Sequence, residues 1–158
     1  MITRMLAFGM LFVLCSPLMA DESTRIVVSG LPMTFTSPTA ADFQAGYVTT
    51  TTTGSNVASY TVSITDGHRS RSIVTRIQCG SPCPTIGSST GIALQWRIAG
   101  AGGQWQTLTS TASNIEMFSL VDGGPARNNS IEFRMLTAWN AAPGQRSFNV
   151  SIHMVVSA

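Results

Sequence analysis

Residues 131–139 read IEFRMLTAW, and residues 148–156 read FNVSIHMVV. In each segment the residues at alternate positions form one face that is more apolar than the other. This two-residue period is typical of a β-strand with one buried face. Ala142-Pro143-Gly144, between the segments, has the composition of a turn. The two segments therefore predict a closing β-hairpin, with Trp139 on the buried face of its first strand.

The same period extends toward the N-terminus, and no stretch has a helical period. Asp66-Gly67 predicts a hairpin turn, and the run Thr49–Thr53 predicts an exposed strand or sheet edge because threonine is β-branched and polar. Together the segments predict about eight or nine strands in an all-β, antiparallel, immunoglobulin-like β-sandwich, with a barrel as the alternative. The further extended segments are expected at residues 25–29 and 31–36, which Gly30-Leu31-Pro32 interrupts, and at residues 43–53, 59–65, 73–79, 92–98, 105–108 and 114–121.

The N-terminus has the features of a cleavable secretory signal peptide. Arg4 supplies a positive charge, residues 5–14 are apolar, and Ala20 ends the segment with a small residue suited to cleavage. A membrane anchor or a lipoprotein attached through Cys15 is the alternative, but the apolar run is short for a membrane span. We therefore expect residues 1–20 to be removed and residues 21–158 to form one domain, secreted to the periplasm, the cell surface or the medium.

The charge of the mature chain is close to zero. The sequence contains nine basic residues, all arginine, and seven acidic residues, and removal of Arg4 leaves eight arginines against seven acids. No basic run is present, so a nucleic-acid partner is not expected. No later segment is apolar enough to span a membrane. Because the net charge is so small, electrostatic repulsion between copies of the chain opposes self-association only weakly.

Cys79 and Cys83 bracket a short turn, Gly80-Ser81-Pro82. In an oxidising compartment so close a pair predicts a disulfide bond that holds the loop. A zinc site would need two more ligands, and His68 and His153 are distant and isolated. The sequence therefore predicts a structural disulfide and neither a metal site nor a cofactor.

Glu116 and Glu132 are the carboxylates to consider for catalysis, because a glycoside hydrolase needs two carboxylates across a cleft. If residues 114–121 and 130–139 form a hairpin, Glu116 lies opposite Arg134, which predicts a cross-strand ion pair. No nucleophile or phosphate-binding motif accompanies them. The sequence predicts no catalytic residue, and a hydrolase remains a remote alternative that requires the two glutamates to share a cleft.

Three aromatic residues are candidates for ligand binding. Trp105 follows a glycine-rich turn and is flanked by glutamines, so its ring is expected to be exposed. Tyr47 and Tyr60 are secondary candidates. Trp96 and Trp139 share the parity of aliphatic neighbours and are expected in the core.

The closing segments, residues 130–157, resemble the final strands of small secreted bacterial immunoglobulin-like β-sandwich proteins, including pilin-like and spore-coat-like surface subunits. The segment Cys-Gly-Ser-Pro-Cys-Pro before Leu-Gln-Trp-Arg also resembles uncharacterised secreted bacterial proteins. The resemblance implies a structural role at the surface and no active site. Chaperone-assembled pilins lack one strand that a neighbour donates, whereas the strand count expected here is complete, so the resemblance does not extend to donor-strand polymerisation.

The leading functional hypothesis is a non-enzymatic secreted or cell-surface protein, structural or adhesive, that associates with itself or a surface partner through edge strands. The alternative is a carbohydrate-binding module that holds a polysaccharide on Trp105, Tyr47 or Tyr60.

Overall fold

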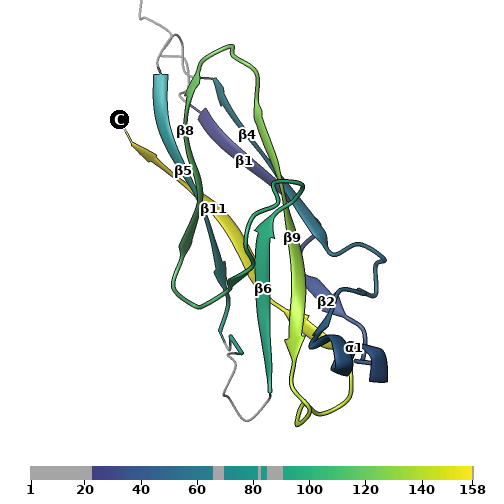
Figure 1. Cartoon of the computed structure of the whole chain (residues 1–158). Helices are drawn as coiled ribbons and strands as arrows, with labels where there is room; N and C mark the ends of the chain where they lie inside the picture. The colour runs from purple at the N-terminus through teal and green to yellow at the C-terminus, as the bar shows by residue number, and fades with distance from the viewer. Residues whose placement is uncertain (1–22, 66–69, 82, 85–90, 158) are drawn as a thin grey trace, which may run out of the picture.

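The computed structural model describes residues 23–65, 70–81, 83–84 and 91–157 (Figure 1). The signal peptide predicted at residues 1–20 lies outside these described residues. Within them the chain forms β-strands and one short helix, and all strand pairs are antiparallel. The predicted all-β class and the antiparallel pairing are therefore confirmed.

The larger sheet contains six strands in the hydrogen-bonded order β1–β4–β9–β6–β7, with β3 also paired to β9. β4 pairs with the first half of β9, and β3 pairs with β9 further along, at Met135 and Leu136. β3 therefore extends the line of β4 on the side of β9 opposite β6. The bounds of the strands are β1 (Ser23–Ser29), β3 (Tyr47–Val48), β4 (Val57–Thr65), β6 (Ile92–Ile98), β7 (Gln106–Thr107) and β9 (Arg127–Thr137).

The second layer is a three-stranded sheet in the order β11–β5–β8, formed by β5 (Ser70–Cys79), β8 (Ser113–Val121) and β11 (Val150–Ser157). A separate pair joins β2 (Met33–Phe35) to β10 (Arg146–Phe148). β1 leads into β2, and β10 leads into β11. The β2–β10 pair therefore brings the beginning and the end of the described chain together on one side of the molecule.

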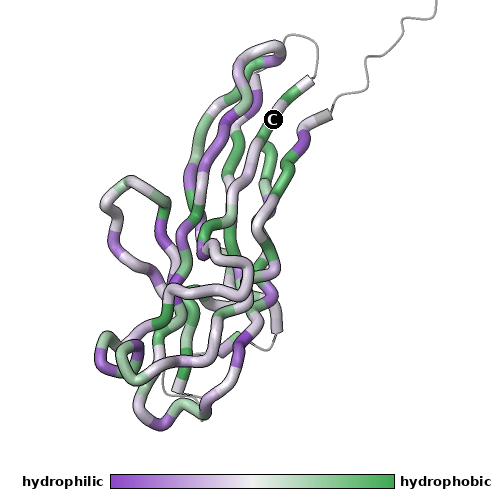
Figure 2. The backbone as a smooth tube through the Cα atoms, turned by 90° about the vertical axis from the view of Figure 1, so that its right-hand side faces the viewer, coloured by the Kyte–Doolittle hydropathy of each residue, from purple (hydrophilic) through white to green (hydrophobic). Residues whose placement is uncertain are grey.

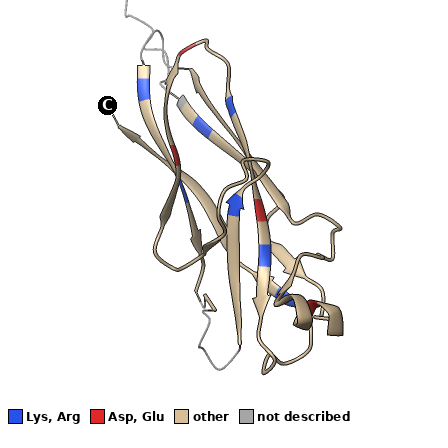
Figure 3. Ribbon diagram, viewed as in Figure 1, with Lys and Arg blue, Asp and Glu red and all other residues tan. Residues whose placement is uncertain are grey.

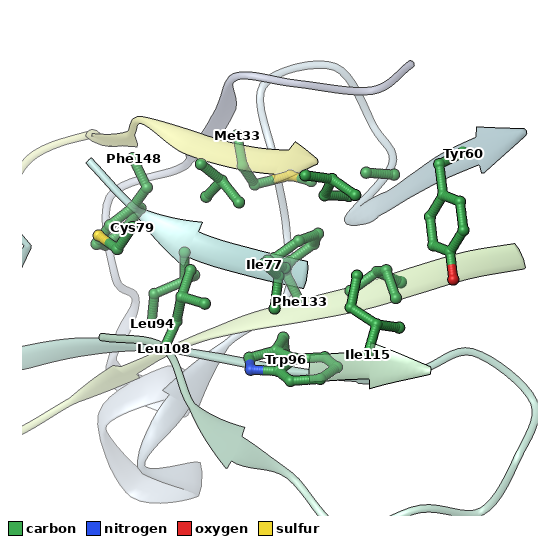
Figure 4. Close-up of a cluster of buried hydrophobic side chains, with 14 of the residues drawn as sticks. Met33, Tyr60, Ile77, Cys79, Leu94, Trp96, Leu108, Ile115, Phe133 and Phe148 are labelled. Atoms are coloured by element: carbon green, nitrogen blue, oxygen red, sulfur yellow. The ribbon is translucent and has the colours of Figure 1, made fainter. Parts of the chain in front are cut away.

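The buried core lies between the larger and the three-stranded sheet, because alternate residues of both supply it. Hydrophobic and hydrophilic residues follow one another along the same strands in Figure 2. Trp96, Phe133 and Leu94 come from the larger sheet, and Ile77 of β5 faces them (Figure 4). Ile73 of β5 is buried in the same cluster. Leu108 and Phe148 close the same cluster. Burial of this shared apolar surface is the main favourable contribution to the folding of both sheets.

Two predicted hairpins are wrong, and so is the pairing supposed for residues 114–121 and 130–139, although the strands in them exist. β4 and β5 lie in different sheets, and so do β8 and β9, and β9 and β11. The predicted turn at Asp66-Gly67 lies outside the described residues. A period of two predicts that a segment is a strand and which face it buries, but it does not predict the partner strand. A turn-rich connection can also carry the chain from one layer to the facing one.

The extended segment predicted over residues 43–53 is right for Tyr47–Val48, which forms β3, and wrong at its start. Ala40–Ala45 forms the helix α1, which begins with a capping box: the Thr39 hydroxyl accepts from the Asp42 N–H, and the Asp42 carboxylate accepts from the Thr39 N–H. The helix ends at Gly46, whose φ of 78° places it in the left-handed region. The threonine run that follows is not an edge strand. Thr51 makes only an isolated bridge to Phe35 and is buried, with its hydroxyl donating to the Ser55 carbonyl.

The two tryptophans that were expected in the core differ in how much of each side chain is exposed to solvent. Trp96 is 1% exposed, as predicted, whereas Trp139 is 76% exposed, so its predicted burial is wrong. β9 ends at Thr137, and Trp139 lies in the turn beyond it, where the parity of the strand no longer sets the direction of a side chain. Its ring stacks on Phe43 of α1, with ring centroids 5.5 Å apart.

The difference in burial predicts that replacement by alanine destabilises the protein strongly at Trp96 and weakly at Trp139. Trp96→Ala should lower the free energy of unfolding by about 3–5 kcal/mol, because it opens a cavity in the core. Trp139→Ala should change it by no more than about 1 kcal/mol, because the ring is mostly in water. Chemical denaturation of the two variants measures both values. Equal losses in the two proteins would contradict the assignment of Trp96 to the core and Trp139 to the surface.

Candidate functional site

Cys79 and Cys83 form the predicted disulfide, with their Cα atoms 5.5 Å apart. Cys79 is buried at the end of β5 and its N–H donates to the Thr109 carbonyl, while Cys83 packs against the core. The bond therefore fixes the start of the connection between β5 and β6 to the core. Among the described residues no group of three or more His, Cys, Asp or Glu residues is arranged to hold a metal ion.

Tyr60 was a candidate for ligand binding, but the structure places it in the interior at 1% exposure, so this assignment is wrong. Its hydroxyl donates to Oε1 of Glu116 at 2.6 Å and lies 3.2 Å from the hydroxyl of Thr75. Tyr60 belongs to the larger sheet, whereas Thr75 and Glu116 belong to the three-stranded sheet. The phenol therefore forms a polar link between the two layers.

The same glutamate also binds Arg127, whose Nη2 and Nε lie 2.8 and 3.2 Å from Oε2. The predicted ion pair between Glu116 and Arg134 is wrong, because β8 pairs with β5 and not with β9. Burial alone would raise the pKa of the Glu116 carboxyl, but hydrogen bonds from Arg127 and Tyr60 outweigh it and hold the pKa below its ordinary value. Burial, together with the hydrogen bond to Glu116, raises the pKa of Tyr60.

Glu132 has a different partner. It pairs directly across the strands with Arg97, and its Oε2 lies 2.7 Å from both Nε and Nη2 of that arginine. Glu132 alternates with the buried Ile131 and Phe133, so it faces outward, whereas Glu116 contacts Tyr60 on the inner side of the same sheet. The two glutamates do not share a cleft, which removes the geometry that the hydrolase alternative required.

The structure brings Tyr47 and Trp105, the two other candidate ligand residues, to one surface. The guanidinium carbon of Arg134 lies 4.8 Å from the centroid of the Tyr47 ring and 4.4 Å from that of the Trp105 ring. Register explains the arrangement: Tyr47 pairs with Leu136, two residues along β9 from Arg134, and Arg134 pairs with Gln95. Both rings thus contact the same cation.

Trp105 also contacts a second arginine. Gln106 pairs with Trp96, so continuing the antiparallel register places Trp105 beside Arg97, whose guanidinium carbon lies 4.4 Å from the Trp105 centroid. In Figure 3 a red and a blue segment in the middle of β9 lie beside the blue end of β6. We call this group the outer-face cluster; its members are Tyr47, Gln95, Arg97, Trp105, Glu132 and Arg134.

Sequence reasoning found the aromatic members of the cluster and missed the role of its arginines. The alternation of residues 131–139 already placed Arg134 on the outer face, but the neighbour of Arg134 depends on the strand order, which the alternation does not contain. Near this cluster, a small pocket of about 130 Å³ is lined by Gly46, Gly91, Leu136, Thr137 and Ala138. None of the predicted ligand residues lines it, and it contains no ionisable side chain.

The edges of the sheets form a second candidate site. β1 and β7 are the edges of the larger sheet, and β11 and β8 are the edges of the three-stranded sheet. β1 and β11 are seven and eight residues long. β1 leads into β2 and β11 follows β10, and β2 and β10 pair with each other. Val27 on β1 is 46% exposed, and Val155 and Val156 on β11 are each 41% exposed. We call this the β1/β11 side.

Comparison with known proteins identifies no relative: no family model matches the chain, and neither a curated protein nor a solved structure matches it. Within the part of the chain that the structure describes, no helix is long and apolar enough to cross a membrane. The function must therefore be argued from the outer-face cluster, the edges and the polar link alone.

The polar link predicts a specific dependence on pH. A carboxyl whose pKa is lowered by folding stabilises the native state above its unfolded pKa, about 4.3, and this contribution is lost as the pH falls through the folded pKa. Glu116→Gln should therefore cost about 1–3 kcal/mol at neutral pH. The difference from the wild type should shrink on the acid side of about pH 4. Denaturation at a series of pH values measures it.

Glu132→Gln is the matched control, because it removes a carboxylate from a partly exposed surface pair and should cost less than about 1 kcal/mol. A loss in Glu116→Gln that stays the same from neutral to acid pH would show that the charged form of Glu116 is not what stabilises the link.

Proposed function

We propose that this chain is a non-enzymatic protein of the cell surface or extracellular space. It is built on an immunoglobulin-like β-sandwich and associates with other copies of itself through the β1/β11 side. The architecture supports the proposal, because two antiparallel layers share one core and the long strands from β4 onward alternate between the layers. Export by the predicted signal peptide would place the protein where a structural or adhesive role is useful, and where the Cys79–Cys83 disulfide is stable.

The observation that carries the proposal is the lack of protection on two long edge strands. Native sheets discourage edge-to-edge pairing with lysine, proline, bulges or very short strands. β11 contains no charged residue apart from its histidine and no proline, and it pairs with β5 over eight residues without a register shift. β1 contains a single charge, Arg25, and no proline. Both edges offer regular backbone N–H and C=O groups to another strand.

The other edge strands of the two sheets, β7 and β8, are protected. β7 is only two residues long. β8 has an irregular register opposite Thr75 and Arg76, and Glu116 lies beside that irregularity. The contrast between the two sides favours association through β1 and β11 and disfavours it through β7 and β8. The small net charge of the chain, +2 over all 158 residues, opposes contact between copies only weakly.

The proposed partner is a second copy of this chain. Antiparallel pairing of equivalent edge strands is self-complementary and extends a sheet across a two-fold axis. The resemblance to pilin-like and spore-coat-like surface subunits agrees with a role in assembly. The mechanism proposed here is addition of one complete edge to another, without donation of a missing strand.

The proposal predicts that a single lysine on either edge weakens association. Val155→Lys and Val27→Lys should each raise the concentration needed for half-association by about tenfold, because a charge on an edge must be desolvated to pair. The monomer should remain folded, since both side chains point outward and are partly in water. Sedimentation velocity over a wide concentration range measures the association.

Met117→Lys is the matched control. Met117 lies on the outer face of β8 and is 71% exposed, so it receives the same charge at a more exposed apolar position on the protected side. The Met117→Lys variant should need the same concentration for half-association as the wild type. A monomeric wild type at every concentration, or equal weakening by Met117→Lys, would overturn the proposal.

A further inference from the structure

Arg134 is a cation that the fold holds in place without neutralising it. Its guanidinium lies against the Tyr47 and Trp105 rings, at 4.8 and 4.4 Å from their centroids. No carboxylate among the described residues pairs with it. Its neighbour Arg97 is neutralised by Glu132 at 2.7 Å, so the outer-face cluster carries one net positive charge.

The donors of Arg134 remain available for hydrogen bonding. A guanidinium contacts aromatic rings through its flat faces, while its N–H groups point outward in its own plane. Nε donates to Oε1 of Gln95 at 2.8 Å, and no described residue accepts from the two Nη groups. Arg134 is partly exposed on β9. Its position is therefore fixed by Gln95 and the rings, while the N–H donors of both Nη groups remain available.

The chemistry of the cluster selects for a planar anion. Burial lowers the pKa of Arg134, Tyr47 opposes this shift, and the charge of Arg97 adds to it. A partly buried cation without a carboxylate partner among the described residues favours an added negative charge. A carboxylate accepts two parallel hydrogen bonds from one guanidinium, which gives orientation as well as attraction. The flanking aromatic rings offer apolar surface for the C–H face of whatever bears that carboxylate. A pyranose ring with a carboxylate substituent supplies both features at once.

We propose that the outer-face cluster binds an acidic polysaccharide, with the carboxylate of a hexuronic acid on Arg134 and the sugar ring against Trp105 or Tyr47. Arg97 and Glu132 hold Trp105 in place and make no direct contact with the carboxylate. The site lies on the outer face of the larger sheet, away from the β1/β11 side, so the inference does not depend on self-association. An assembly of copies would present several such sites and gain avidity.

The test measures binding of dilute protein to immobilised polygalacturonate, a polymer of a hexuronic acid. Arg134→Gln and Trp105→Ala should each weaken binding by about tenfold or more. Arg134→Lys keeps the charge but loses the planar pair of donors, so it should also weaken binding by about tenfold. Arg76→Gln, which removes the same charge from the outer face of the other sheet, should bind as the wild type does.

Two further polymers test the ligand class. Dextran is a neutral polysaccharide, and poly-L-glutamate carries carboxylates without sugar rings; both should bind far more weakly than polygalacturonate. Equal binding of dextran would overturn the role of the anion, and equal binding of poly-L-glutamate would indicate an acidic peptide in place of a glycan. No binding of polygalacturonate, or full binding by both Arg134 variants, would overturn the site. Circular dichroism establishes that each variant is folded, and normal self-association in a variant that has lost binding leaves the proposed function intact.

Discussion

Two sheets that each have one apolar face depend on a single shared core. Trp96, Phe133 and Ile77 are almost completely removed from water only because both layers are present. Neither sheet could bury its inner face alone, and the apolar area that they cover together outweighs the loss of chain entropy. The layers are also joined by hydrogen bonds, since the Tyr60 hydroxyl reaches Glu116 across the core. This polar contact is satisfied on both sides, so it fixes the relative position of the layers without leaving a buried group unpaired.

The requirement for a shared core explains which features of the fold the sequence predicted. Ile131, Phe133 and Met135 had to face inward, and they do. The strand partners depend on how the layers stack, and that information is not contained in the period of any one segment. The predicted burial of Trp139 was wrong for a related reason. β9 ends at Thr137, so the alternation of side chains along the strand no longer applies to Trp139. The helix at residues 40–45 was missed because it is shorter than two helical turns and carries no buried residue, so only its Thr39–Asp42 capping box marked it.

The candidate sites also depend partly on the local sequence pattern and partly on the strand order, and only the local pattern could be used for prediction. Tyr47 and Trp105 were identified as surface aromatics from their local sequence, but β9 brings them to one guanidinium from opposite sides. Tyr60 was named as a ligand candidate although its alternation with Val62 and Ile64 matched the core, and the structure agrees with the alternation. The edges could not be identified at all before the strand order was known. The contrast between the regular β11 and the irregular β8 is a property of the assembled sheet.

In the proposed assembly, copies of the chain pair through the β1/β11 side. Amide hydrogen exchange, compared between dilute and concentrated protein, tests it most directly, because a backbone N–H that enters a new ladder becomes protected. The account predicts slower exchange at high concentration along β11 and β1, with no change along β8 and β7. Protection that is independent of concentration on all four edge strands, or that appears on β8 and β7, would contradict it.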